Sequence, residues 1–158
     1  MADFMALLRT GSLIGQVARD LRVVTDLRFA AFGLTTQQAA LLAYAASGET
    51  SPRALASAVG TDTAGATRLI DRLAAKGLLA RRPHPGDRRS VVIDVTPAGL
   101  DLAPRLPAVF GEVSAGLLTG LSDDEIYQLS ALLGRVAENL RDPTAGVRAA
   151  SRPAVDVD

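Results

Sequence analysis

The chain has no cysteine, and His84 is its single histidine. The absence of cysteine excludes disulfide bonds, thiol catalysis and every zinc site with a thiolate ligand. A Ser-His-Asp triad would have to use His84, which lies in the string Pro83-His84-Pro85-Gly86-Asp87, a composition typical of an exposed turn. We therefore predict that the protein is not an enzyme and that it holds no metal ion or cofactor.

Long apolar runs are also missing, although hydrophobic residues make up 48% of the 158 residues. Arg, Asp, Gly or Pro interrupts each apolar stretch before it reaches the roughly 18 residues that a membrane-spanning helix needs. The segment from Met1 to Arg9 lacks the basic start and the small-residue cleavage site of a secretory signal. We therefore expect a cytoplasmic protein without membrane contact, of a length that suits one domain.

The net charge is zero, with 17 basic and 17 acidic residues, but the charges are unevenly distributed. Between Arg53 and Arg89, eight basic residues stand against three acidic ones, which leaves the rest of the chain net negative by five. A basic middle segment between acidic ends suits a local contact with a polyanion such as nucleic acid. The alternative is a charged surface that only faces solvent.

Apolar spacing and capping residues predict two helices at the start of the chain. Apolar residues between Phe4 and about Phe32 mostly lie three or four positions apart, as on one face of a long helix. Thr35 and Gln38 then form a capping box for a second helix that runs to about Ser47.

Two shorter helices are predicted to follow in close succession. Ser51 with Pro52 is a strong start signal for a third helix that stops at Gly60, and Asp62 can cap a fourth helix that runs to Lys76. Because the turn between these two helices is so tight, they are predicted to form a helix-turn-helix.

The hydrophobic period changes after the fourth helix. Residues 79–83 and 90–95 are short runs of β type around a Pro-Gly-Asp turn, and they predict a two-stranded hairpin. A helix is expected from residue 98 to about residue 118, kinked or split by Pro104 and Pro107.

The last predicted helix has the clearest start signal of the chain. Ser122 and Glu125 form its capping box, and Leu121 can pack against Ile126. The residues beyond 142 have no apolar period and are rich in Pro, Ala, Gly and charge, which predicts a disordered tail over 143–158.

Three strings of the chain, taken in order, resemble the MarR family of bacterial regulators. They are Leu34-Thr35 through Leu78-Leu79, then Arg81-Arg82-Pro83 with Asp87-Arg88-Arg89, and finally Leu121-Ser122-Asp123-Asp124-Glu125. The resemblance covers roughly residues 30–142 and implies an all-α fold with a small β-wing, a winged helix-turn-helix.

The resemblance also implies an organisation and a function. A dimerisation helix at 1–33 and further dimerisation helices at 97–142 would flank a winged helix-turn-helix DNA-binding domain at 34–96. The family's members form homodimers that straddle a palindromic operator, and many are repressors released by small aromatic ligands. The resemblance therefore implies partners of three kinds, which are double-stranded DNA, a second copy of the chain and a small-molecule effector whose pocket the sequence does not reveal.

One face of the predicted fourth helix is suited to DNA. The side expected to pack inward carries Ala66, Leu69, Ile70 and Leu73, and the other side carries Thr63, Ala64, Thr67, Arg68 and Asp71. In a major groove, Arg68 is the best base reader because its guanidinium fork can bond O6 and N7 of guanine. The alternative for Arg68 is a surface ion pair with Asp71 or Asp62.

The other residues on this face are smaller. Thr63 and Thr67 can contact a phosphate or a thymine methyl group. Ala64 and Gly65 offer little hydrogen bonding, so that readout there would depend on DNA shape. Gly65 stands where the family usually carries Ser, Thr or another larger residue.

The predicted hairpin carries more cations than a stable turn requires. Arg82, Arg88 and Arg89 are expected to contact DNA, with Arg89 reaching into a minor groove. Asp87 is expected to form the turn or to orient an arginine. Ser51 and Arg53, at the start of the third helix, suit a phosphate. The full set of predicted DNA-binding residues is Ser51, Arg53, Thr63, Ala64, Thr67, Arg68, Arg82, Asp87, Arg88 and Arg89.

The basic helix-turn-helix and hairpin predict DNA binding, and the resemblance implies that the protein is a sequence-specific, ligand-responsive repressor. The rival interpretation is a ligand-binding or protein-interaction module that keeps the winged fold without strong DNA binding. The arginines of the hairpin favour the repressor, whereas Ala64 and Gly65 leave room for the rival.

Overall fold

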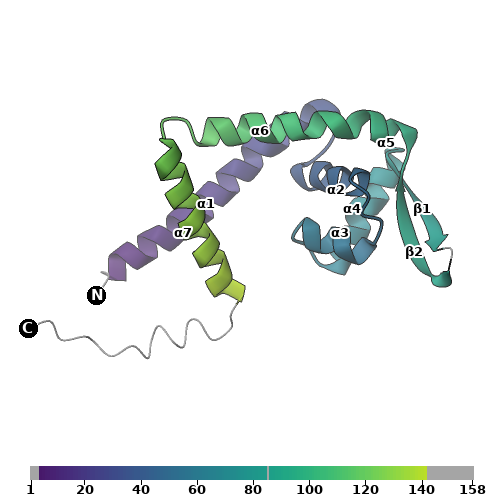
Figure 1. Ribbon diagram of the computed structural model, residues 1–158, viewed down its shortest axis with the longest axis horizontal. Coiled ribbons are helices and arrows are strands. Elements are labelled where there is room, and N and C mark those ends of the chain that lie inside the picture. Colours follow the sequence, from purple (N-terminus) through teal and green to yellow (C-terminus); the bar gives the residue numbers. More distant parts are fainter. Residues whose placement is uncertain (1–3, 85, 142–158) are drawn as a thin grey trace, which may run out of the picture. The chain divides into compact units, whose positions relative to one another are not determined.

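The computed structural model describes residues 4–84 and 86–141, and the side chains of residues 87–90 lie outside the description. In these residues the chain forms helices and one two-stranded antiparallel sheet (Figure 1). The elements in chain order are α1 (Phe4–Phe29), η1 (Ala30–Phe32), α2 (Thr36–Ala46), α3 (Pro52–Ala58), α4 (Thr63–Ala75), β1 (Leu79–His84), β2 (Asp87–Val95), α5 (Pro97–Leu102), η2 (Ala103–Arg105), α6 (Leu106–Leu117) and α7 (Asp123–Arg141).

The chain divides into two compact units, to which α1 and α6 both contribute. Residues 14–115 form the first, here called the winged unit, and residues 1–13 with 116–158 form the second, here called the terminal unit. All the fully buried apolar side chains that the structure describes belong to the winged unit. Among them are Phe29, Leu41, Leu55, Ile70 and Leu106.

The helix starts predicted from capping residues are confirmed. Thr35 Oγ1 accepts from Gln38 N at 3.3 Å, and Gln38 Oε1 accepts from Thr35 N at 3.2 Å, which completes the capping box of α2. Ser51 Oγ accepts from Ala54 N at 3.4 Å. These bonds satisfy amide groups that the first turn of a helix leaves without a partner.

The helix-turn-helix of α3 and α4 is also confirmed. Asp62 caps α4 by accepting from Gly65 N at 2.6 Å, and Gly60 makes the preceding turn with a φ of 67°, where a residue with a Cβ would be strained. The four side chains predicted to face inward from α4 are buried. They are Ala66, Leu69, Ile70 and Leu73.

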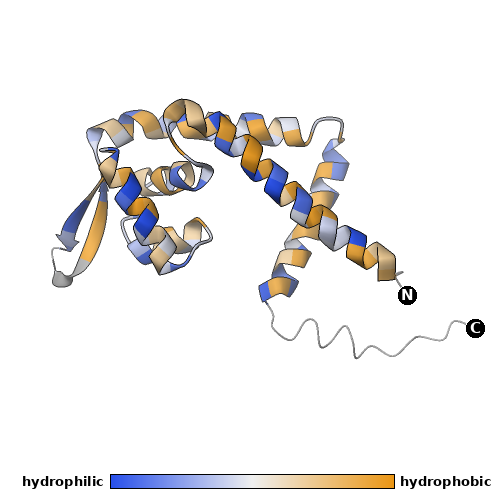
Figure 2. Ribbon diagram, turned by 180° about the vertical axis from the view of Figure 1, so that it is seen from behind, coloured by the Kyte–Doolittle hydropathy of each residue, from blue (hydrophilic) through white to orange (hydrophobic). Residues whose placement is uncertain are grey.

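The wing is longer than the sequence indicated. The strands β1 and β2 continue pairing as far as His84 and Asp87. The register shifts between Pro83 and His84, and the hydrophobic pattern of a single strand cannot reveal such a shift. Figure 2 shows β1 as mostly hydrophilic and the part of β2 toward the base of the wing as largely hydrophobic. At the base of the wing, Ile93 is buried and its N–H donates to Thr50 O at 2.9 Å, which ties β2 to the loop before α3.

A close backbone contact joins the wing to α5. Thr96 Oγ1 donates to Gly77 O at 2.6 Å and accepts from Gly99 N at 3.2 Å. A Cβ on Gly99 would lie 2.7 Å from Val95 Cγ1 and even closer to Leu78 O, a backbone atom with little freedom to move. Glycine at position 99 therefore allows α5 to begin directly against the wing.

The helix predicted over residues 98–118 is split, which is one of the two outcomes that its prolines predicted. Pro104 and Pro107 lack the N–H groups that an unbroken helix would use, so that a short 3₁₀ segment, η2, separates α5 from α6. On this side of the core, Phe110 of α6 packs on Phe29 with ring centroids 4.7 Å apart, and the Arg105 guanidinium lies 4.9 Å from the centroid of Phe32.

The start of α7 has the predicted capping box. Ser122 N donates to Glu125 Oε2 at 2.8 Å, and this bond, with a second one from the Ser122 hydroxyl, holds the pKa of Glu125 below its usual value. The tail predicted over residues 143–158 lies outside the described residues. Across the described part of the chain, no helix is long and apolar enough to cross a membrane.

The terminal unit lacks a core of its own. None of its described side chains, in residues 4–13 and 116–141, is buried. On α1, Phe4 is 69% exposed, and on α7 the apolar stripe of Leu129, Leu132, Leu133, Val136 and Leu140 is exposed at every position. These helices therefore present apolar faces that nothing in a single described chain covers.

Candidate nucleic-acid interface

The outer face of α4 exposes the residues that the helical period predicted for it. Thr63, Ala64, Thr67 and Arg68 are all exposed, and the Thr67 hydroxyl donates to Thr63 O at 2.9 Å. Since this bond uses the only proton of the hydroxyl, Thr67 is left with acceptor capacity and its methyl group. The face therefore offers one strong donor group, the Arg68 guanidinium.

Arg68 has no ion pair among the described residues, and the two acids considered for it have other partners. Asp71 pairs with Arg81 of β1 at 2.7 Å, and Asp62 accepts from Gly65 N as the cap of α4. The alternative of an Arg68 ion pair with either acid is not formed in this structure. Within the described part of the chain, the Arg68 guanidinium thus has no anionic partner.

Glycine at position 65 has a structural reason. A Cβ there would overlap the Thr61 hydroxyl and would lie 3.0 Å from Asp62 Oδ1 and 3.3 Å from Thr61 Cβ. A larger residue at position 65 would therefore require the Thr61 side chain to move. Glycine replaces the larger residue that is usual in the family because the turn before α4 lies so close to this position.

Two arginines of β1 are engaged within the winged unit. Arg82 forms a bidentate ion pair with Asp94 of β2, in which Nη2 donates to Oδ1 at 2.8 Å and Nε donates to Oδ2. This hydrogen bonding raises the pKa of Arg82 and lowers the pKa of Asp94. Arg81 bridges from the wing to Asp71 and Thr67 O on α4. DNA contact by Arg82 stays a prediction, and it would have to be made from a side chain already oriented by Asp94.

The tip of the wing is described only in part. Asp87, Arg88 and Arg89 belong to β2 by their backbone, but their side chains lie outside the described residues, so their predicted roles stay predictions. His84 is the last residue of β1, and its Nδ1 accepts from Gly86 N in the turn at 3.1 Å.

The start of α3 is less open to a phosphate than the sequence suggested. Ser51 N donates to Glu49 Oε1 at 2.7 Å, so a carboxylate already occupies this end of the helix. Arg53 is exposed. A DNA contact by Ser51 and Arg53 stays a prediction, with Arg53 as the group free to make it.

Lys76, to which the sequence analysis gave no functional part, joins the end of α4 to the start of α2. Its Nζ donates to Gly33 O and, at 3.1 Å, to Gln38 Oε1. The only lysine of the chain therefore links Gly33 O, at the end of η1, to Gln38 Oε1, which also accepts from Thr35 N in the capping box of α2.

Asp26 of α1 connects that helix to the start of α2. Its Oδ1 accepts from both the N–H and the hydroxyl of Thr36, each at 2.6 Å. Burial alone would raise the pKa of Asp26, but the hydrogen bonds from Thr36, with nearby Arg22, lower it below the ordinary value. The ionised carboxylate is thus the form that the fold stabilises.

Replacing Asp26 with alanine is expected to lower the free energy of unfolding by about 1–2 kcal/mol near pH 7, the size of a lost helix cap. Because the folded pKa is depressed, this stabilisation is present above the unfolded pKa of about 3.9 and is lost as the pH falls through the folded pKa. Urea unfolding at pH 7 and pH 3 measures it, with the exposed Asp20→Ala on α1 as the control. An equal difference at both pH values would contradict the electrostatic reason.

The winged unit also contains a hollow between α1, the start of α2 and α6, with a volume of about 390 Å³. Its wall combines apolar groups such as Phe110 and Val113 with polar ones, among them Arg22, Thr36 and Gln37. Within the described residues, no cluster of His, Asp and Glu is arranged to hold a metal ion.

Comparison with known proteins agrees with this architecture. The family model described as "MarR family" matches residues 32–90. The HTH-type transcriptional regulator PecS of Dickeya dadantii (strain 3937) is 38% identical over 90 residues, which are 57% of this chain and 54% of PecS. The match thus spans about half the length of this curated relative.

Two solved structures resemble the chain over most of its length. The transcriptional regulator SlyA has 27% identity and a TM-score of 0.74, with 85% of this chain and 93% of SlyA covered. A MarR variant from E. coli, complexed with operator DNA, has 25% identity and a TM-score of 0.75, with 85% of this chain and 99% of that chain covered. These relatives are transcriptional regulators and not enzymes. Residues 32–90 thus match the MarR family, and the fold of the chain is the winged helix-turn-helix of these regulators.

Proposed function

We propose that the protein is a transcriptional repressor that binds a palindromic operator as a homodimer and is released by a small-molecule effector. The observation that carries this proposal is the exposed outer face of α4, where Arg68 has no anionic partner within the described chain. A guanidinium free of an intramolecular anion is suited to guanine in a major groove. The MarR relative that is complexed with operator DNA supports the same use of the fold.

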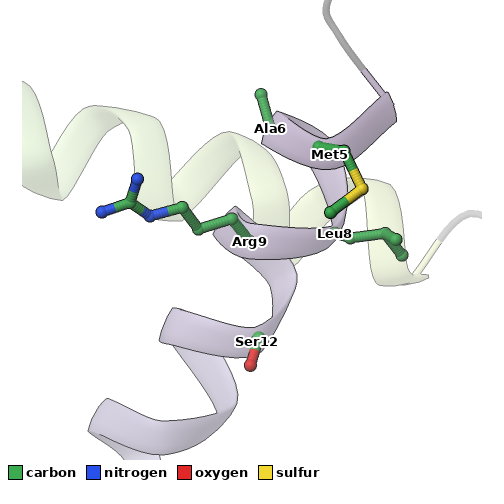
Figure 3. A pocket seen from close by; sticks show the side chains of 5 residues that line it. All are labelled: Met5, Ala6, Leu8, Arg9 and Ser12. Atoms are coloured by element: carbon green, nitrogen blue, oxygen red, sulfur yellow. The ribbon is translucent and has the colours of Figure 1, made fainter.

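The homodimer is supported by the apolar faces of the terminal unit. A hollow of about 630 Å³ is lined by Met5, Ala6, Leu8, Arg9 and Ser12 of α1. Figure 3 shows Leu8 and Arg9 extending to opposite sides of the helix. Since all its lining residues come from one helix, the hollow is an open surface, which a second copy of the chain would cover.

Footprinting on the DNA upstream of the protein's own gene tests the proposal. A dimer with two-fold symmetry is expected to protect a pseudo-palindrome with half-site centres about 10 bp apart, on one face of the duplex. Protection without dyad symmetry would contradict the dimeric reading. Absence of DNA binding would favour the rival, a ligand-binding or protein-interaction module with a winged fold.

The hollow beside α1 and α6 supports a binding site for the effector. Its apolar wall, with Phe110, can stack on an aromatic ring, and Arg22 at the same hollow can pair with a carboxylate. The hollow adjoins Thr36, which Asp26 holds, so a ligand there would act on the connection between α1 and α2. Benzoate is expected to raise the melting temperature of the wild type and not of Arg22→Ala; an equal shift in both would place the site elsewhere.

A further inference from the structure

A second, smaller hollow lies on α4 beside the face assigned to base contact. Its volume is about 150 Å³, and it is lined by Gln37, Thr61, Gly65, Arg68, Leu69 and Arg72. The residues come from the first turn of α2, the turn before α4 and α4 itself, all within the winged unit. Arg68 and Arg72 are four positions apart, so they project from the same side of the helix.

Neither arginine forms an ion pair with an acid among the residues that the structure describes. Like charges four residues apart on a helix repel each other. The segment that forms α2 has no charged residue, and the acids of α4 and its cap, Asp71 and Asp62, are engaged by Arg81 and by Gly65 N. Arg72, like Arg68, has no ion pair in the described part of the chain. The hollow therefore holds two guanidinium groups that form no ion pair with any described residue.

The remaining lining groups suit an oxyanion. The Gln37 amide can donate two hydrogen bonds and the Thr61 hydroxyl can donate one. Glycine at position 65 keeps the floor of the hollow open, because a side chain there would meet Thr61. Donors from the first turn of α2 and from the turn before α4 thus line the same hollow as the two guanidinium groups of α4.

We infer that this hollow binds a backbone phosphate of double-stranded DNA, with Arg72 as the principal phosphate contact. The inference rests on the proposed function and deepens it, because it adds Arg72, Gln37 and Thr61 to the DNA-binding surface. Arg68 lies between the phosphate position and the outer face of α4. The phosphate would therefore fix the position of the recognition helix, while Arg68 reads a base.

The test is a salt series of DNA binding with Arg72→Ala. Removing one phosphate contact is expected to reduce the slope of log affinity against log salt by about 0.9, which corresponds to a loss of about eightfold at 0.1 M salt. The loss is expected to be equal on operator and unrelated DNA, because a phosphate carries no sequence information. Arg72→Lys keeps the charge and is expected to restore most of the slope.

Arg135→Ala is the matched control, since it removes the same charge from an exposed position on α7 in the terminal unit. Its salt slope is expected to equal that of the wild type. A wild-type slope in Arg72→Ala, with an unchanged melting temperature, overturns the phosphate site but leaves the proposed function standing. A wild-type protein that binds no DNA overturns the proposed function itself, and with it this inference.

Discussion

Replacing Leu132 with glutamate is expected to prevent formation of the proposed homodimer. Leu132 lies in the apolar stripe of α7 and is 55% exposed in the single chain, so a dimer interface formed by this stripe would bury it. An unpaired carboxylate in such an interface costs several kcal/mol, which raises the dissociation constant by about a hundredfold or more. Sedimentation over a range of protein concentrations measures the change.

Ala131→Glu is the control for this substitution. Ala131 is exposed and lies one position away, on the side of α7 opposite the stripe, and the substitution adds the same charge. It is expected to leave the dimer intact. A wild type that sediments as a monomer of 16.4 kDa, or a Leu132→Glu variant that remains dimeric, would contradict the assignment of α7 to the interface.

Operator binding is expected to be lost together with the dimer. A monomer can occupy only one half-site, whereas the dimer gains both contacts in one association event. Circular dichroism separates this result from unfolding, because the buried core lies in the winged unit and not on α7.

Local signals made most helices predictable from the sequence. A capping residue acts within three positions of itself, so Thr35, Ser51, Asp62 and Ser122 identify helix starts without knowledge of the fold. The inward face of α4 was equally predictable, because its apolar positions follow the helical period.

The partners of charged groups were not predictable, because they depend on contacts between distant elements. Arg82 and Asp94 meet only when the register of the two strands is known, and Lys76 reaches Gly33, which lies 43 positions earlier. The cationic hollow was not predictable either, because its lining residues meet only when α2 packs beside α4. Sequence reasoning therefore identified the arginines as a group but could not separate those with acid partners from those without.

Because Arg68 is one of the arginines without a described acid partner, its replacement is expected to have a clear effect on DNA binding. Asp62 accepts from Gly65 N and Asp71 pairs with Arg81, so neither acid depends on Arg68 as a partner. Arg68→Ala therefore breaks no described ion pair. An exposed substitution of this kind usually changes stability by no more than about 0.5 kcal/mol. The melting temperature is therefore expected to remain nearly that of the wild type.

Operator affinity, in contrast, is expected to fall by about 1–3 kcal/mol in Arg68→Ala, the range for one arginine that reads guanine through two hydrogen bonds. The loss is expected to be larger on the operator than on unrelated DNA, which distinguishes a base contact from the uniform loss expected for Arg72→Ala. Arg68→Lys is the informative comparison, because lysine keeps the charge but lacks the planar fork. If Arg68→Lys retains full preference for the operator, Arg68 contributes only charge, and sequence readout must come from the wing or from DNA shape.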